Sequence, residues 1–398
     1  MLISIAFIFL FGLVFAKIAE KIHIPGLFGM ILAGILIGPF GLNLLDDSIL
    51  NISAELRKIA LIIILMRAGL SLNLNDLYKI GRPAILMCFL PACFEIIGVV
   101  LLAPKLLGVT VSEAALIGAT IAAVSPAVIV PKMIQLLEKG YGVSKGIPQL
   151  ILAGASVDDV FVIVLFTAFI GLVKGTKITA ASFYNIPISL VTGIFVGLAI
   201  GLLLTEFWKK FKMGNTKKLM LIFSIGFIMT YVEDIIPIPF ASLLAIMFLG
   251  IGIKRGDEEL SLELGRSVSQ LWIVGEVVLF VLVGVTVNLK FAIAAGFAPV
   301  LLILVALIFR VTGVALSCLG TNFTTKEKIF TMIAYTPKAT VQAAIGGIPL
   351  AMGLACGNMA LTVAVLSILI TAPLGAFLIE KTYQKFLVIE EGFHEYLA

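Results

Sequence analysis

Charged residues are scarce in this sequence. Only 13% of its 398 residues are Asp, Glu, Lys or Arg, whereas a soluble domain carries about a quarter. Apolar residues make up 61%, and the mean hydropathy is +1.19. This composition excludes an ordinary soluble domain and predicts a polytopic membrane protein. The net charge of +5 then reflects the loops between spans, and no nucleic-acid partner is expected.

Cysteine is also rare, and the positions of its four residues argue against two kinds of site. Cys88, Cys93, Cys318 and Cys356 all lie within apolar runs, without the spacing of a metal-binding motif. We therefore expect packing residues, with no disulfide framework. No resident cofactor is expected for the chain.

Long apolar runs occupy almost the whole chain. A membrane-spanning helix needs roughly 20 predominantly apolar residues. The first run has no basic residue before it and no small-residue cleavage site, so we expect a retained span rather than a signal peptide. The sequence predicts an all-α integral membrane protein with about 13 transmembrane helices, in which residues 1–398 form one membrane domain. The candidate spans are 1–21, 26–43, 55–72, 82–107, 111–137, 148–173, 183–207, 217–235, 239–254, 266–289, 292–320, 327–350 and 358–382.

Lysine and arginine are unevenly distributed over the predicted loops. If the N-terminus lies outside, most of the 28 lysines and arginines fall in cytoplasmic loops or in the C-terminal segment. The positive-inside rule therefore favours an outside N-terminus, a cytoplasmic C-terminus and an odd number of spans.

Two of the runs are interrupted by proline. The run 111–137 contains Pro126, and the run 327–350 contains Pro337. Proline removes a backbone donor and clashes with the preceding turn, so both helices should break near the middle of the membrane. Interrupted spans at corresponding positions of two halves indicate a transporter with inverted repeats, here the fourth to sixth and the eleventh to thirteenth runs. Two merely kinked helices are the alternative.

Two adjacent aspartates, Asp158 and Asp159, lie at the middle of the run 148–173. Ionisable residues at the centre of a membrane are costly and mark ion or proton pathways. Neighbouring buried carboxylates titrate as a coupled unit, and they hold protons or a hard cation rather than stand empty. Competition between a proton and a cation for Asp158 and Asp159 would be the chemistry of exchange. A structural buried pair is the alternative.

Three further charges fall deep within predicted spans. Glu95 lies on the fourth run and Arg310 on the eleventh, which are equivalent under the proposed repeat. We expect these two to pair, because an unpaired buried charge is strongly destabilising. Arg310 could instead pair with an aspartate or snorkel. Lys338 lies at the predicted break of the twelfth run, where an ammonium group can neutralise the carbonyl ends of broken helices.

Hydroxyl groups near the breaks are candidate cation ligands. A lone Ser or Thr in a helix more often bonds back to its own backbone, so the sequence leaves the role of each open. The candidates are Thr120, Ser125, Ser156 and Thr340.

Three sequence strings together resemble a known family. They are GASVDDV around the aspartates, AAVSPAVIVP at the first break and TPKATVQAAIGG at the second. Over essentially its whole length, the chain resembles sodium/proton antiporters of the cation:proton antiporter superfamily, in the branch of bacterial and animal NHA-type exchangers. The resemblance implies the NhaA-type fold with two crossed discontinuous helices. It also implies a homodimer in the cell (inner) membrane that exchanges Na+ or Li+ for H+.

The same resemblance assigns roles to residues and segments. Asp159 would be the cation ligand and proton carrier, Asp158 an accessory ligand or carrier, and Lys338 would lie where the broken helices cross. The core would move against the scaffold in an elevator-like cycle. The implied parts are an ion-transporting core at about 82–173 and 292–382, and a dimerisation scaffold at about 1–72 and 183–289.

Arg310 departs from the electrogenic members of that family, which usually carry lysine on this helix. Arginine stays protonated in proteins and cannot carry a second proton, so electroneutral exchange is favoured, although Asp158 could still carry one. K+/H+ exchange is the runner-up. A cation channel is less favoured because it needs no crossed broken helices. An enzyme is not expected, since an intramembrane aspartyl protease needs its two aspartates on separate helices.

Overall fold

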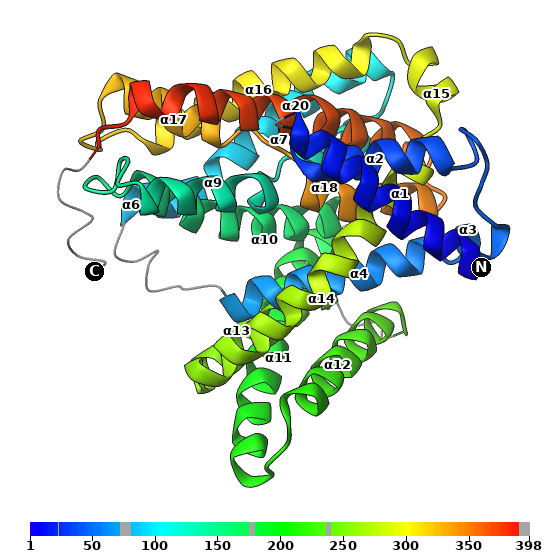
Figure 1. Cartoon of the computed structure of the whole chain (residues 1–398), viewed down its shortest axis with the longest axis vertical. Helices are drawn as coiled ribbons and strands as arrows, with labels where there is room; N and C mark the ends of the chain where they lie inside the picture. The colour runs from blue at the N-terminus through cyan, green and yellow to red at the C-terminus, as the bar shows by residue number, and fades with distance from the viewer. Residues whose placement is uncertain (23, 72–80, 175–179, 236–239, 390–398) are drawn as a thin grey trace. The chain divides into compact units, whose positions relative to one another are not determined.

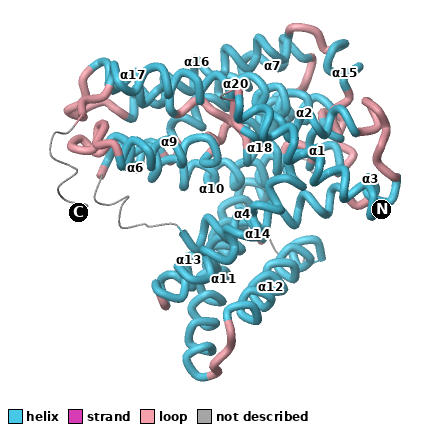
Figure 2. The backbone as a smooth tube through the Cα atoms, viewed as in Figure 1, coloured by secondary structure: helices cyan, strands magenta, loops and turns pink. Residues whose placement is uncertain are grey.

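The chain folds into helices, as the sequence predicted. The computed structural model describes all residues except 23, 72–80, 175–179, 236–239 and 390–398. Within the described ranges, strand-type pairing is limited to one isolated bridge between Tyr141 and Ile389. Figure 2 shows the helices in cyan and their described connections in pink. The helices are α1 (Leu2–Lys21), α2 (Gly26–Ile37), α3 (Asp47–Asn51), α4 (Ser53–Ser71), α6 (Arg82–Met87), α7 (Leu90–Leu107), α8 (Val111–Ile121), α9 (Pro126–Glu138), α10 (Ile147–Val173), α11 (Ala180–Lys210), α12 (Asn215–Ile235), α13 (Ser242–Gly256), α14 (Glu258–Val285), α15 (Leu289–Ala294), α16 (Ala298–Ser317), α17 (Thr325–Ala334), α18 (Thr340–Ile345), α19 (Ile348–Ala351) and α20 (Gly357–Phe386).

Every apolar run proposed from the sequence overlaps at least one of these helices. Among the described residues, eight helical segments are long and apolar enough to cross a membrane by themselves. They are α1, α6 with α7, α8 with α9, α10, the 191–210 part of α11, α14, α16 and α20. The count of about 13 crossings remains a prediction.

The contacts divide the chain into two compact units. Unit 1 comprises 1–50, 73–162 and 280–398, and unit 2 comprises 51–72 and 163–279. Both segments expected to form the core lie largely in unit 1, but so do residues 1–50, which the sequence had placed with the scaffold. The assignment of these segments to a moving core and a dimerisation scaffold remains a prediction.

Both breaks predicted from proline are present in unit 1. Helix α8 ends at Ile121 and α9 begins at Pro126, while α17 ends at Ala334 and α18 begins at Thr340. Pro126 occupies the first position of α9, where its missing N–H costs nothing. Pro337 lies within the second gap and cannot continue the helix that ends before it. Each gap exposes backbone groups that need partners from elsewhere in the fold.

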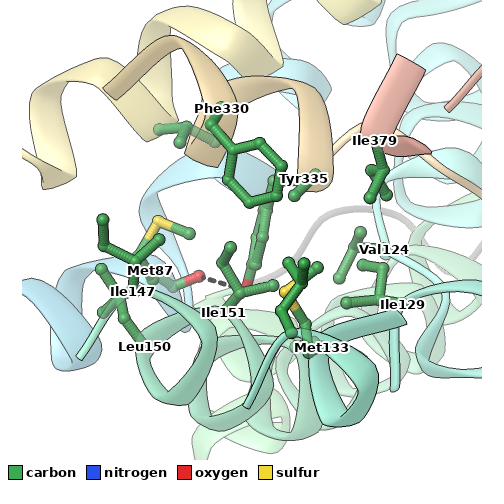
Figure 3. Close-up of a cluster of buried hydrophobic side chains, with 14 of the residues drawn as sticks. Met87, Val124, Ile129, Met133, Ile147, Leu150, Ile151, Phe330, Tyr335 and Ile379 are labelled. Atoms are coloured by element: carbon green, nitrogen blue, oxygen red, sulfur yellow. Dashed lines mark hydrogen bonds between the residues drawn. The ribbon is translucent and has the colours of Figure 1, made fainter. Parts of the chain in front are cut away.

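A third break was not expected. The run 82–107 was predicted as one helix, yet α6 ends at Met87 and α7 begins at Leu90. Pro91 explains the interruption, because it cannot donate to the carbonyl four residues earlier, which is that of Met87. The Tyr335 hydroxyl donates to this carbonyl at 3.1 Å. Figure 3 shows this contact within a cluster of buried side chains from α6, α9, α10, α17 and α20.

The two broken helices begin alike. Thr110 and Glu113 form a capping box before α8, and Thr324 and Glu327 form the same motif before α17. Two contacting pairs in unit 1 are each 215 residues apart, Glu95 with Arg310 and Ser125 with Thr340. A constant separation between contacting residues is the expected property of two repeats that meet at equivalent positions.

Unit 2 contains a close contact between α11 and α13. Gly193, Gly197 and Gly201 follow one another at intervals of four on α11, and a Cβ at each would overlap a carbonyl oxygen of α13 or of the residue before it. Small residues at this spacing allow two helix backbones to approach closely.

Candidate ion-binding site

Arg310 lies where the two broken helices of unit 1, α8 with α9 and α17 with α18, meet at their gaps. This meeting point is called the crossing. Arg310 lies on α16, which packs beside α7 and α20 (Figure 1), and its side chain is fully buried. Its Nη1 is 2.9 Å from Glu95 Oε2, and its Nη2 is 2.8 Å from Asp158 Oδ2. The predicted pair with Glu95 is therefore present. The alternative pairing with an aspartate is present as well, since the five donors of a guanidinium can serve several acceptors.

The remaining donors of Arg310 serve the broken helices. Its Nε donates to the Tyr335 carbonyl at the end of α17, at 2.6 Å. Its Nη1 also donates to the Ala122 carbonyl, just beyond the end of α8. One side chain thus neutralises the carbonyl ends of both half-helices, where the helix dipole places partial negative charge.

Lys338 lies in the gap between α17 and α18, as the sequence predicted, and is fully buried. Its Nζ is 2.7 Å from Glu95 Oε1 and donates to the Ile121 carbonyl at 2.5 Å. Its backbone N–H donates to Thr371 Oγ1 at 2.9 Å. Glu95 therefore lies between two cations, Arg310 on α16 and Lys338 in the second break.

The two gaps touch each other directly. The N–H of Ser125 donates to the Pro337 carbonyl at 2.8 Å, which joins the first gap to the second. The hydroxyl oxygens of Ser125 and Thr340 are 3.5 Å apart, and both residues are buried. Two candidate ligands from the sequence therefore meet at the crossing.

The remaining two candidate hydroxyls are those of Thr120 and Ser156. The Thr120 hydroxyl donates to the Leu116 carbonyl of its own helix at 2.8 Å, which is the alternative that the sequence left open. Ser156 lies on α10, but its side chain is outside the part of the chain that the structure describes.

The two aspartates have different surroundings. Asp158 is fully buried, and its Oδ2 accepts the Val124 N–H at 2.9 Å in addition to the Arg310 guanidinium. Asp159 is half-buried, and its Oδ1 is buried without a hydrogen-bond partner among the described residues. Asp158 Oδ1 also lacks such a partner. Asp158 therefore has Arg310 as a counter-ion at Oδ2, whereas Asp159 has no ion pair within the described part of the chain.

The charges at the crossing leave one negative charge without a counterpart. Of the described side chains there, Glu95, Asp158 and Asp159 are carboxylates, and Arg310 and Lys338 are cations. Burying an unpaired carboxylate is costly, so the site favours one additional positive charge. One proton or one monovalent cation would supply it.

Comparison with known proteins decides the family. The profile described as "Sodium/hydrogen exchanger, transmembrane" matches residues 5–382. Sodium/hydrogen exchanger 9B2 of Mus musculus is 32% identical over 386 residues, covering 93% of this chain and 69% of that protein. Sodium/hydrogen exchanger 9B1 of Homo sapiens is also 32% identical, covering 95% of this chain and 76% of that protein. The chain belongs to the sodium/hydrogen exchanger family.

A solved structure confirms the fold of this exchanger. The sodium proton antiporter MjNhaP1 from Methanocaldococcus jannaschii at pH 8 matches it with a TM-score of 0.82 at 20% identity. The match covers 96% of this chain and 97% of that structure. The antiporter fold with inverted repeats is thus confirmed. Membership of the family makes the chain a multi-pass membrane protein and supports cation/proton exchange as its activity.

Three residues that hold the crossing of this exchanger were missed from the sequence. Tyr335, Gln342 and Thr371 are buried and supply partners to backbone groups at the breaks. Gln342 lies inside the string TPKATVQAAIGG, and an uncharged polar side chain in so apolar a stretch was a usable signal. Tyr335 and Thr371 offered no comparable signal, because hydroxyl groups within helices are common.

Proposed function

We propose that this chain exchanges Na+ or Li+ for H+ across the membrane by alternating access, with cation and proton competing for Asp159. The observation that carries the proposal is the contrast between the aspartates. Asp158 has Arg310 as its counter-ion, whereas Asp159 has a buried oxygen without a partner in the described chain. An intramembrane carboxylate in this state is a functional site by default.

The roles of the neighbouring residues follow from their contacts. Asp158 offers Oδ1 as an accessory oxygen while Oδ2 stays engaged. Arg310, Lys338 and Glu95 form the fixed frame of the crossing, with Ser125 and Thr340 as nearby oxygen donors. In the proposed cycle, a homodimer in the cell (inner) membrane has its N-terminus outside and its C-terminus in the cytoplasm. Each core, at about 82–173 and 292–382, then moves against the dimerisation scaffold.

Transport by the purified protein in proteoliposomes tests the cation. A pH gradient is imposed, and internal pH is followed while Na+, Li+, K+ or choline is added to separate samples. We expect Na+ and Li+ to dissipate the gradient in a saturable way, because a small hard cation suits carboxylate oxygens. Dissipation by K+ alone would replace the proposal with K+/H+ exchange. A response without saturation or proton coupling would favour a channel.

In the same preparation, the rate of exchange is expected to be independent of the membrane potential. One Na+ or one H+ balances the charge at the crossing, so both loaded states carry the same charge. Arg310 cannot supply a second proton. With the potential clamped by K+ and valinomycin at several values, the initial rate of Na+-driven proton movement should stay constant.

A clear voltage dependence would contradict the one-for-one stoichiometry while leaving exchange itself intact. Asp158 would then be the candidate for the second proton. A symmetric K+ concentration with valinomycin, which clamps the potential at zero, is the matched control in the same vesicles.

A further inference from the structure

A single peptide group at the first break is held from both sides. The Ala123 carbonyl accepts a hydrogen bond from Gln342 Nε2 at 2.7 Å, and the Val124 N–H donates to Asp158 Oδ2 at 2.9 Å. These two backbone groups belong to the same peptide unit and point in opposite directions when it is trans. Gln342 and Asp158 therefore form hydrogen bonds to opposite edges of the planar 123–124 peptide group.

This peptide group depends on those two side chains. It lies between α8 and α9, beyond the last helical residue, Ile121. Backbone groups at a helix end lack intrahelical partners and take them from side chains, water or ligands. The direction of the Val124 N–H is consequently coupled to whatever holds the Ala123 carbonyl.

Gln342 is itself held in one orientation. It lies on α18 with 1% of its surface exposed, and Nε2 also donates to the Ile121 carbonyl at 3.2 Å. Two carbonyl oxygens can be satisfied only by the amide nitrogen, because the amide oxygen has no hydrogen to donate. The amide of Gln342 thus cannot flip without losing both contacts.

We propose that Gln342 is a positioning residue for the ion site. It holds the Ala123 carbonyl so that the Val124 N–H stays on Asp158 Oδ2, which leaves Asp158 Oδ1 and Asp159 for the cation. Hydrogen bonds in a chain polarise one another, so losing the amide weakens the contact to Asp158 without altering either aspartate. This inference rests on the proposed function.

Gln342→Met tests the inference, because methionine has a similar length and no strong donor. In proteoliposomes we expect the apparent KM for Na+ to rise about tenfold, the scale of one hydrogen bond to a charged group. The maximum rate should change much less. The matched variant is Thr371→Val, which removes the 2.9 Å contact to the Lys338 N–H at the second break and leaves the 123–124 peptide intact. It should lose comparable thermal stability and keep the wild-type KM.

Two results would overturn the role of Gln342. The first is reduced thermal stability in Gln342→Met with an unchanged KM, which is the signature of a purely structural residue. The second is an equal rise of KM in Thr371→Val, which would show that any loosening of the crossing suffices. If Gln342→Met does not fold, Gln342→Asn, whose amide is one methylene short, replaces it, with a smaller rise expected.

A second measurement separates this inference from the proposed function. Na+-dependent thermal stabilisation of the detergent-solubilised protein reports binding without transport, and Gln342→Met should need about tenfold more Na+ for the same stabilisation. A wild-type protein without Na+-driven proton movement contradicts the proposed function, and this inference with it. Wild-type exchange together with wild-type Na+ dependence in the variant contradicts this inference alone.

Discussion

Asp159→Asn is expected to abolish Na+-driven proton movement, leaving the rate of protein-free liposomes. The substitution keeps the shape of the side chain but removes the carboxylate that has no ion pair in the described part of the chain. An amide neither releases a proton nor provides an anionic oxygen for a cation, so both halves of the exchange lose their carrier. Proteoliposomes with an imposed pH gradient give the rate directly.

Asp47→Asn is the matched control for this loss. Asp47 is exposed at the start of the short helix α3, so its neutralisation should leave both exchange and thermal stability at wild-type values. The fold of Asp159→Asn is checked by size-exclusion chromatography and thermal unfolding in detergent. Exchange by a folded Asp159→Asn protein at the wild-type rate would show that the central assignment is wrong.

Arg310→Gln is expected to cause the largest loss of stability among single neutral substitutions at the crossing. Arg310 neutralises both Glu95 and Asp158 and serves two backbone carbonyls. Breaking a buried ion pair by removing one partner typically costs about 3–5 kcal/mol. Glu95→Gln should cost less, because Arg310 then retains Asp158 as a partner.

The double variant Glu95→Gln with Arg310→Gln measures the coupling between the two. It leaves Asp158 and Asp159 with Lys338, which keeps the wild-type excess of one carboxylate, so part of the loss should be recovered relative to the sum of the single variants. Strictly additive losses, measured by thermal or denaturant unfolding in detergent, would contradict the pairing. Glu206→Gln, which breaks the exposed pair with Lys209, is the control and should leave stability unchanged.

The two central carboxylates show how far sequence reasoning could go. Their adjacency in an apolar run, Asp158 beside Asp159, was enough to predict a buried titrating site, because ionisable residues at mid-membrane are costly and mark ion or proton pathways. Their separate roles were assigned only through the family resemblance. The structure supplies a physical basis for the difference, since Asp158 meets Arg310 and the Val124 N–H while Asp159 meets neither. Neighbouring helix positions point about 100° apart, and only the packed fold decides what each direction contains.

The helix breaks were likewise predicted only in part from the sequence. Pro126 and Pro337 predicted two interruptions, because proline removes a backbone N–H donor and its ring clashes with the preceding turn of the same helix. The interruption after Met87 was missed, although Pro91 lies well inside the predicted run 82–107 and could have predicted it. What stabilises that gap is the Tyr335 hydroxyl, from a residue 248 positions away.

Properties that are local in the chain could be predicted from the amino-acid sequence. These are membrane residence, the approximate positions of most helices, the two main breaks and the presence of a charged centre, all set by composition, run length and proline chemistry. Which polar partners meet depends on the packed fold. Arg310 could have paired with Glu95 or with Asp158 on sequence grounds, and it pairs with both. The physical reason is that a buried polar group takes its partners from whichever segments the fold brings within about 3 Å, and that proximity is not encoded at any single position.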